Sequence, residues 1–414
     1  MRDGGRLAAA VAILDDMEMR HRPVRLALKS WGEGARYAGS RDRAFVSGLV
    51  LDCLRRRRSL AWRMGDESWR GVVLATTRFA WEWPTGRIVA AAADPHGPGA
   101  LSEAEQERLE GPRSLEEAPE AIRGDYPDWT QPMFERAFGD RAVLEGAALA
   151  ERAPVDIRVN TLKTDADKAF RALEQLGARR VEASSTALRI PPAAAAERSP
   201  PLEALPEFAK GWFEIQDLGS QIAAKAARDI DHRQVLDFCA GGGGKTLALA
   251  ALMGNTGQLF AFDADGRRLA ATHERARRAG VRNLQVRTPL RANPLEGLEE
   301  RMDLVFVDAP CTGSGVWRRH PDAKWRLTDE QLRRRMAEQD EVLGAAAAFV
   351  KPGGRLVYVT CSMFCEENED RVEAFLARSP DFHLAERYRH LSPRANGTDG
   401  FFIGELYRHA PTVT

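Results

Sequence analysis

An apolar run, a glycine-rich turn and a helix-like segment follow one another near the middle of the chain, and they constrain its fold most. Residues 235–239 read Val-Leu-Asp-Phe-Cys, glycines occupy 241–244, and apolar residues continue over 247–253. A strand, a tight turn and a helix in this order open a parallel α/β unit. Glycines let the backbone approach a ligand, and a helix N-terminus favours an anion or carboxylate. Four glycines exceed what a plain tight connection needs, so a ligand site is predicted, with the plain connection as the alternative.

Two nucleotide-binding patterns fail at this turn. A phosphate-binding loop that ends in the Gly-Lys-Thr of 244–246 needs its first glycine at the position of Cys239. The dinucleotide fingerprint needs glycines at relative positions one, three and six, and a start at Gly241 or Gly242 does not supply the sixth. Among nucleoside cofactors without a pyrophosphate, S-adenosyl-L-methionine fits best. Asp263, directly after the next apolar run, is placed to accept two hydrogen bonds from a ribose, although it can equally cap a helix.

Two cysteines follow two further apolar runs. The run 304–307 leads through Asp308 to Cys311, and the run 356–359 leads to Cys361. In an open parallel sheet, ligands lie outside the carboxyl ends of the strands, so both thiols are expected to face the cofactor. A buried cysteine is usually a small apolar residue. Two of them at one sheet edge, one beside a carboxylate, favour chemistry over packing.

A thiolate beside a sulfonium methyl donor suits methylation of a pyrimidine. Carbon 5 of the ring is a poor nucleophile, and addition of a cysteine at carbon 6 makes it enamine-like, so that it can take the methyl group. Asp308 can hydrogen-bond the ring at N3, and a base must later remove the C5 proton. The pyrimidine must be unpaired or flipped out of a helix to be reached.

The first seventy residues are basic, with 15 Lys and Arg against 9 Asp and Glu. Apolar residues at helical spacing over 46–54 predict a helical bundle, and four arginines follow at 55–58. This arginine run is either a phosphate contact or a solvated helix end. Residues 92–125, rich in proline, glycine and acids, are interpreted as a loop or linker.

A small α+β segment comes next. The alternation over 155–159 predicts a strand, Thr164 and Asp167 resemble a capping box, and Gly177 ends a short helix. The predicted domains are therefore a helical domain with an acidic linker over 1–125, an α+β insert over 126–210 and an α/β sheet domain over 211–414.

The composition is typical of a packed cytoplasmic protein. Hydrophobic residues make up 44% and charged residues 29% of the 414, without a run of about 20 apolar residues or a signal-peptide pattern. Five scattered cysteines without CxxC spacing favour neither a disulfide framework nor a zinc cluster. We expect no membrane segment, no metal and a monomer.

With these residues in view, the chain resembles the Sun/Fmu-type (NOL1/Nop/Sun) RNA cytosine-C5 methyltransferases, in particular the bacterial ribosomal-RNA branch. The resemblance spans most of the chain. Its markers are Gln216-Asp217 with Ser220-Gln221, the turn 239–246, Asp308-Ala309-Pro310-Cys311, Arg319-His320-Pro321-Asp322 with Lys324-Trp325, Thr360-Cys361-Ser362 with Glu367-Asn368-Glu369, and Thr398-Asp399-Gly400-Phe401-Phe402. It implies a Rossmann-like class I methyltransferase sheet, preceded by an all-α NusB-like domain and a small α+β RNA-binding insert that contains Arg158 and Asn160.

The resemblance also implies roles for single residues. Cys361 is expected as the nucleophile, Cys311 as the thiol that assists release of the methylated RNA, and Asp308 at the junction of cofactor and base. Asp308 and Asp263 are expected around S-adenosyl-L-methionine together with Cys239, Ala240, Gly241, Gly242, Gly243, Gly244 and Lys245. The second thiol, at Cys361, favours RNA over DNA as the substrate.

The chain departs from the family pattern twice. Gly241 and Gly242 replace an Ala-Pro pair, and the acid expected near residue 289 is missing from Thr288, Pro289, Leu290 and Arg291. The expected activity is methylation of cytosine C5 in RNA, with 16S ribosomal RNA as the substrate. Methylation of transfer RNA by the same site, and a non-catalytic RNA-binding assembly factor, are the alternatives.

Overall fold

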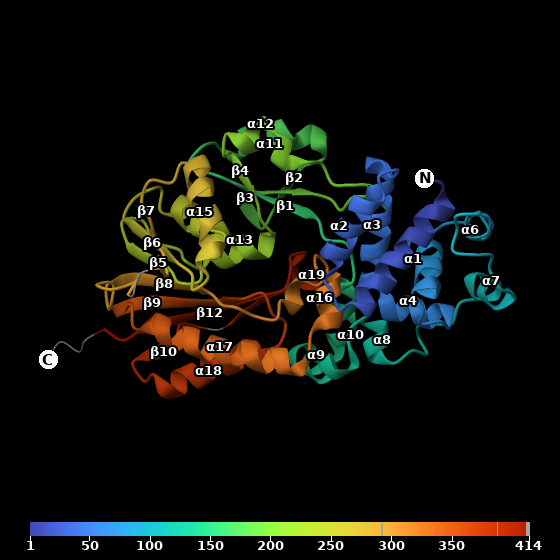
Figure 1. The fold of residues 1–414 in the computed structure, drawn as a ribbon. Coiled ribbons are helices and arrows are strands. Elements are labelled where there is room, and N and C mark those ends of the chain that lie inside the picture. The colour runs from blue at the N-terminus through green and yellow to red at the C-terminus, as the bar shows by residue number, and fades with distance from the viewer. Residues whose placement is uncertain (291–292, 387, 411–414) are drawn as a thin grey trace. The chain divides into compact units, whose positions relative to one another are not determined.

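The computed structural model describes residues 1–290, 293–386 and 388–410 (Figure 1). Two compact units are present. The helical unit comprises Met1–Ala153, Pro192–Ser199 and Trp317–Leu327, and the sheet unit comprises Pro154–Pro191, Pro200–Val316 and Thr328–Thr414. The three domains expected from the sequence stay a prediction. No helix within the described ranges has both the length and the apolar character needed to cross a membrane.

The helical unit confirms the predicted bundle. Its helices are α1 (Asp3–Met19), α2 (Val24–Gly34), α3 (Ser40–Arg55), α4 (Arg57–Met64), α5 (Trp69–Ala75), η1 (Thr76–Ala80), α6 (Thr85–Ala92), α7 (Glu103–Glu110), α8 (Glu120–Arg123), η2 (Asp128–Thr130), α9 (Gln131–Phe138), η3 (Gly139–Arg141), α10 (Ala142–Leu149) and α16 (Pro321–Arg326). Val46, Leu49, Val50 and Cys53 of α3 recur at helical spacing and are fully buried in one core.

The loop predicted over 92–125 is wrong for Glu103–Glu110, which forms α7, and for Glu120–Arg123, which forms α8. Ser102 and Glu105 form a capping box, in which each side chain accepts a hydrogen bond from the backbone N–H of the other residue. Leu109 of α7 is completely buried in the core of the unit. A good cap and one buried anchor thus form a helix in a segment whose composition favours a loop.

The first part of the sheet unit is a four-stranded antiparallel sheet in the order β2-β3-β1-β4. Its elements are β1 (Val155–Val159), α11 (Ala166–Leu173), η4 (Glu174–Leu176), β2 (Arg179–Val181), β3 (Ser184–Ile190), η5 (Leu202–Ala204), α12 (Pro206–Ala209) and β4 (Phe213–Ile215). The predicted strand and short helix are confirmed. The helix cap is Asp165 rather than Thr164, because the Asp165 carboxylate accepts the N–H of Lys168 at 2.7 Å.

The larger sheet runs in the order β10-β12-β9-β8-β5-β6-β7, with β11 paired to β12. Strands β5 to β9 pair in parallel, and β12 is antiparallel to β9. Its elements are α13 (Leu218–Lys225), β5 (Gln234–Asp237), α14 (Gly244–Leu252), β6 (Gln258–Phe262), α15 (Gly266–Ala279), β7 (Leu284–Arg287), β8 (Met302–Asp308), η6 (Ser314–Val316), α17 (Asp329–Ala347), β9 (Val350–Thr360), η7 (Cys365–Glu367), α18 (Glu369–Arg378), β10 (Phe382–Leu384), β11 (Arg389–Leu391), α19 (Pro393–Asn396) and β12 (Phe401–Arg408).

Helices cover both faces of the larger sheet, with α13 and α14 on one face and α17 and α18 on the other (Figure 1). Alternate strand residues supply the two cores. Leu304 and Phe306 of β8 pack toward α13 and α14, whereas Val305 and Val307 pack toward α17 and α18. Burial on both faces explains the continuous apolar runs of the central strands. The strand order reverses at β5, where ligands of such sheets bind.

Candidate active site

The glycine turn between β5 and α14 is held against the neighbouring strands. Phe238 donates its N–H to Phe306 at 2.8 Å, and Ala240 donates to Phe262 at 2.9 Å. Gly243 has a φ of +84°, and a Cβ there would lie 2.9 Å from the hydroxyl of Thr272. A side chain at this position would therefore be strained and would crowd α15.

Asp263 lies against this turn, as predicted. Its carboxylate accepts the N–H of Gly241 at 2.8 Å and the N–H of Asp265 at 2.8 Å. Arg268 forms an ion pair with it at 3.2 Å. Asp263 therefore connects the end of β6 to the glycine turn, and its role toward a ribose stays a prediction.

Asp237, the last residue of β5, has a carboxylate that is only half satisfied. Thr246 donates its hydroxyl proton to Oδ2 at 2.6 Å, whereas Oδ1 has no hydrogen-bond partner among the described residues. Burial raises the pKa of this carboxyl to about 7, and the carboxylate of Asp308 adds to the effect. An orphaned buried acceptor of this kind fits a ligand with a cationic nitrogen, such as the amino group of S-adenosyl-L-methionine. The sequence analysis gave Asp237 no role.

Lys245 and Asp308 form an ion pair next to Asp237. The ammonium of Lys245 donates to Oδ2 of Asp308 at 2.7 Å, and the lysine side chain is only 10% exposed. Burial by itself lowers the pKa of Lys245, but the attraction of Asp308 outweighs burial and raises it. The lysine thus stays charged and holds Asp308 at the end of β8.

The thiols of Cys311 and Cys361 lie together, with 3.3 Å between their sulfur atoms. The hydrogen bond to Cys361, together with burial, raises the pKa of Cys311 far above its usual value. A raised pKa favours the protonated form of Cys311, and either sulfur can be the donor in this contact. The structure brings together the two thiols and Asp308 at the carboxyl ends of β8 and β9, as the sequence predicts.

Glu367, in η7, connects the two cysteine loops. Its completely buried carboxylate accepts the N–H and the hydroxyl of Thr312, next to Cys311, and the hydroxyl of Ser362, next to Cys361. Gln339 of α17 donates to it at 3.0 Å and also to Pro310 at 2.8 Å. Burial raises the pKa of Glu367. The sequence analysis quoted Glu367 as a family marker without a role, and no pattern in the sequence shows that it joins both loops.

Two other marker motifs meet behind the thiols. Gly400 donates its N–H to Gly315 at 2.8 Å, and Gly315 donates to Cys361 at 3.0 Å. A Cβ on Gly315 would lie 2.3 Å from the carbonyl oxygen of Gly400. Asp217, the N-cap of α13, accepts the N–H of Asp399. The segment before β12 thus fixes the backbone of both cysteine loops.

The motif over 319–325 belongs to the helical unit. Lys324 donates to the carbonyl of Arg55 at 2.9 Å, and Trp325 donates its indole N–H to Leu54 at 2.7 Å. Three of the four arginines in the run 55–58 form ion pairs with acids of the helical unit. Arg55 pairs with Asp52, Arg57 with Glu18 and Arg58 with Asp128. These contacts favour the helix-end interpretation of the run over a phosphate contact.

Other predicted residues are used inside the sheet unit. Arg158 is 6% exposed and donates to Gln216 at 2.6 Å, and Asn160 donates to Gly211 and to Ala279 at 2.8 Å each. These side chains hold the small sheet rather than face outward. Near residue 289, Leu290 is 92% exposed, and Arg291 lies outside the described residues.

Comparisons with known proteins identify a similar family, similar sequences and similar folds. The family described as 16S rRNA methyltransferase RsmB/F matches residues 226–407. A relative named Ribosomal RNA small subunit methyltransferase B, from Klebsiella pneumoniae subsp. pneumoniae, is 32% identical over 290 residues. The alignment covers 68% of this chain and 66% of the relative, so the chain spans just under two thirds of that protein.

Solved structures share the fold. The crystal structure of PH0851 superposes with a TM-score of 0.73 at 24% identity, covering 98% of this chain and 99% of that one. A methyltransferase homolog from Pyrococcus horikoshii gives 0.60 at 28% identity, covering 72% of this chain and 100% of that one. The expected fold class, a Rossmann-like methyltransferase sheet preceded by a helical region, is confirmed.

Proposed function

The chain belongs to the RsmB/F family of 16S rRNA methyltransferases, and from this premise we propose that it methylates carbon 5 of cytosine in small-subunit ribosomal RNA. The methyl donor is S-adenosyl-L-methionine, and the reaction takes place in the cytoplasm. The observation that carries the proposal is the pair of thiols 3.3 Å apart at the carboxyl ends of β8 and β9. A methyltransferase that acts on a nitrogen or a hydroxyl needs no thiol there, whereas addition to a pyrimidine does.

Cys361 adds through its sulfur to carbon 6 of the cytosine. The S–H of Cys311, whose sulfur lies 3.3 Å away, can stabilise the negative charge that develops on the sulfur of Cys361 during this attack. A proton at N3 of the ring, held by Asp308, supports the electron pair that the attack displaces. Lys245 donates a hydrogen bond to one carboxylate oxygen of Asp308. The other oxygen is the one that we expect to contact the cytosine ring.

When bound, S-adenosyl-L-methionine would supply an electrophilic methyl group to carbon 5, and the C5 proton would then pass to a base. The electron pair of that C–H bond re-forms the C5–C6 double bond, the C6–S bond breaks, and Cys361 takes up a proton as N3 gives one up. Cys311, whose sulfur lies 3.3 Å from that of Cys361, assists this release. Asp237 and the glycine turn would hold the methyl donor, with Oδ1 of Asp237 as the acceptor for its amino group.

A basic cavity of the sheet unit supports RNA as the substrate. It has a volume of about 640 Å³ and is lined by Lys163, His273, Arg277 and Arg282 among others. None of these side chains pairs with an acid in the part of the chain that the structure describes. The cationic side chains of Lys163, Arg277 and Arg282 around this cavity suit the phosphates of a polynucleotide.

Transfer of a tritiated methyl group to RNA tests the proposal. Cys361→Ala should abolish transfer, and Cys311→Ala should accumulate a denaturant-resistant adduct of protein and RNA. Cys365→Ala, which removes another thiol of the same unit, should leave transfer near the wild-type level. Full activity of Cys361→Ala would contradict the mechanism. Bisulfite sequencing of total RNA with and without the gene identifies the substrate: loss of a methylcytosine from transfer RNA alone would overturn the ribosomal assignment.

A further inference from the structure

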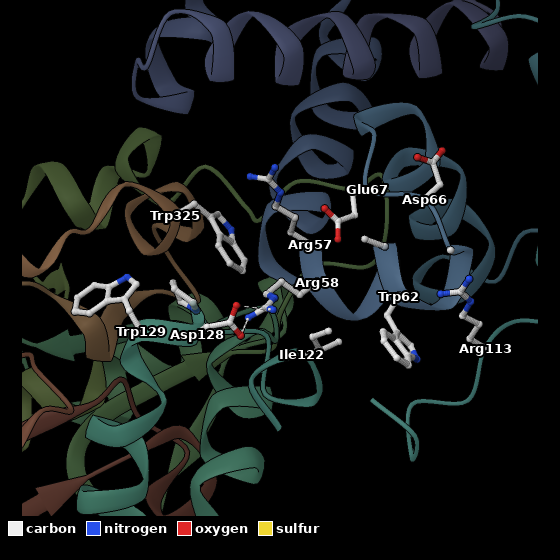
Figure 2. A pocket seen from close by; sticks show the side chains of 13 residues that line it. Arg57, Arg58, Trp62, Asp66, Glu67, Arg113, Ile122, Asp128, Trp129 and Trp325 are labelled. Atoms are coloured by element: carbon white, nitrogen blue, oxygen red, sulfur yellow. Dashed lines mark hydrogen bonds and ion pairs between the residues drawn. The ribbon is translucent and has the colours of Figure 1, made fainter. Parts of the chain in front are cut away.

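The helical unit contains a cavity of about 770 Å³ with three tryptophans in its wall (Figure 2). We call it the tryptophan cavity and define it by Trp62, Trp129, Trp325, Arg113 and Glu67. Trp129 and Trp325 lie at one end, and Trp62 lies beside Arg113 at the other (Figure 2). These residues come from α4, η2 and α16, from the turn between α4 and α5, and from the chain after α7. No role in methyl transfer has been derived for any of them.

Two of the indoles are fixed by their N–H groups. Trp62 donates to the carbonyl of Ser114 at 2.9 Å, and Trp325 donates to that of Leu54 at 2.7 Å. All three tryptophans are half-buried. Because the polar edges of these two rings are satisfied by backbone, what they offer to the cavity is aromatic surface.

The charged groups of the cavity wall fall into two sets. Arg58 and Asp128 are paired through two hydrogen bonds of 2.6 and 3.0 Å, and Arg57 is paired with Glu18 at 2.7 Å. In each of these pairs the charge of the arginine is balanced by a carboxylate. Asp66 is held differently, because its carboxylate accepts the N–H and the hydroxyl of Ser68.

Arg113 and Glu67 form the second set. Both are exposed, and neither has an ion-pair partner among the described residues. The guanidinium of Arg113 lies 5.9 Å from the ring of Trp62, so a cation and an aromatic face stand side by side. Glu67 adds a carboxylate that points toward the centre of the cavity (Figure 2).

We propose that the tryptophan cavity binds an unpaired nucleotide of the RNA strand. A ligand that satisfies this set of open groups needs a flat ring for the indoles, an anion for Arg113 and an N–H donor for Glu67. A nucleotide carries all three, and stacking on aromatic side chains is how proteins hold unpaired bases. The inference rests on RNA being the substrate, and it adds a second contact, outside the sheet unit, that a double helix cannot make.

The carboxylate also predicts which bases are preferred. The carboxylate of Glu67 accepts hydrogen bonds, so it favours a base with an exocyclic amino group, as in cytosine, adenine or guanine. Uracil has no amino group, and its one donor at this edge, the N3–H, lies between two carbonyl oxygens that repel a carboxylate. A strand rich in cytosine is therefore expected to bind more tightly than a strand rich in uracil.

Binding of fluorescein-labelled RNA to the full chain, followed by anisotropy, tests the cavity. The probes are a single-stranded 12-mer of mixed sequence and the same strand annealed to its complement. Trp129→Ala should weaken binding of the single strand about tenfold, with little change for the duplex, because one stacked base is lost. Trp129→Phe keeps a ring and should retain most of the affinity. Trp31→Ala removes a half-buried tryptophan of the same unit outside the cavity and is the matched control.

Trp129 is chosen because its side chain makes no hydrogen bond to any described residue, so its loss disturbs the fold least. Thermal melting of each variant must match the wild type for the comparison to count. Arg113→Ala should lower the dependence of log affinity on log salt by about one, as expected for one phosphate contact. Glu67→Gln should reduce the preference for an oligocytidine over an oligouridine.

Equal single-strand affinities of wild type, Trp129→Ala and Trp31→Ala would overturn the cavity as an RNA site. If the wild type still transfers methyl groups to RNA in that case, only this inference fails and the proposed function stands. A wild type that neither binds the probes nor methylates RNA would remove both. Equal affinity for the two homopolymers would overturn the assignment of Glu67 while leaving the stacking intact.

Discussion

The thiol site of the sheet unit and the tryptophan cavity of the helical unit differ in the burial and hydrogen bonding of their charged groups. Around Cys311 and Cys361, the connecting carboxylate of Glu367 is completely buried and accepts hydrogen bonds from Thr312, Ser362 and Gln339. In the tryptophan cavity, Glu67 and Arg113 are exposed and have no ion-pair partner in the part of the chain that the structure describes.

We relate this difference to the two proposed tasks, which are covalent catalysis at the thiol site and recognition of RNA at the tryptophan cavity. A covalent step needs its atoms fixed before the substrate arrives, because preorganised groups do not have to be reoriented in the transition state. A site that selects a ligand instead keeps open groups that only the ligand can satisfy. Beside the thiol site, Oδ1 of Asp237 is a buried acceptor without a hydrogen-bond partner among the described residues, and this is where we expect the methyl donor to bind.

Apart from loss of the nucleophile Cys361, the largest effect is expected from Lys245→Met. Removal of the ammonium leaves Asp308 without its ion pair beside the buried Asp237, and loss of one partner of a buried pair typically costs about 3 to 5 kcal/mol. Methyl transfer should fall about a thousandfold. Lys351→Met removes an exposed lysine that pairs with Asp303 in the same unit, and it should change the rate less than twofold. Comparable rates for the two variants would contradict the role of the buried pair.

Glu367→Ala should rank second, with about a hundredfold loss of kcat. The substitution leaves donors of Thr312, Ser362 and Gln339 without their acceptor, and each unsatisfied buried group costs about 1 to 3 kcal/mol. Because Glu367 does not contact the reacting atoms, KM for the methyl donor should stay nearly constant. Glu367→Gln restores an acceptor and should recover much of kcat. A variant with normal kcat would show that the loops do not depend on this connection.

The raised pKa of Asp237 predicts that the affinity for the methyl donor changes about tenfold with pH. Its pKa of about 7 means that the carboxyl is protonated below pH 7 and ionised above it, in the field of Asp308, Lys245 and Asp263. A cationic ligand binds the ionised form, so affinity for S-adenosyl-L-methionine should rise as pH rises through 7. Calorimetric titration from pH 6 to 8 measures it. Asp237→Asn should bind weakly with a flat profile, and a wild-type affinity that fell with pH would contradict the assignment.

The same carboxyl affects folding in the opposite sense. A pKa raised on folding adds stability that is fully present below the unfolded value near 4 and is lost as pH rises through 7. Without ligand, Asp237→Asn should therefore raise the free energy of unfolding at pH 8, by about 2 kcal/mol. Urea unfolding at pH 5 and pH 8 checks the difference.

The smallest effect is expected from Asp128→Asn in the wall of the tryptophan cavity. Asp128 is 75% exposed, and its pair with Arg58 is of the kind that contributes about 0 to 1 kcal/mol. Affinity for single-stranded RNA should change less than twofold, in contrast to Trp129→Ala. A larger loss would mean that the paired wall, rather than the open groups, recognises the ligand.

Much of the sheet unit could be predicted from the sequence because its signals are local. The continuous apolar runs of β5, β6, β8 and β9, and the glycines between β5 and α14, each indicate an element without reference to distant residues. Their parallel pairing then places Asp308, Cys311 and Cys361 at one edge, since the carboxyl ends of parallel strands meet there.

Other features depend on contacts between segments far apart in the sequence. Glu367 reaches Thr312 across 55 positions, and the tryptophan cavity combines Trp62 with Trp325, so no spacing rule reveals either. The unsatisfied oxygen of Asp237 depends on how the surrounding residues bury the carboxylate, and no sequence pattern indicates this burial. For Arg158 and Asn160, the family resemblance implies contacts with RNA. In the structure, Arg158 donates to Gln216 and Asn160 donates to Ala279, so both side chains make contacts within the protein.

The most direct test of the central claim is to map the covalent bond. RNA that carries 5-fluorocytosine cannot lose a proton from carbon 5, so after methyl transfer the protein should remain attached to the base. Peptide mass spectrometry of that complex should place the adduct on Cys361, and Cys361→Ala should form none. An adduct on Cys311 or Cys365, or methylation of ordinary RNA without any adduct on the fluorinated strand, would contradict the account.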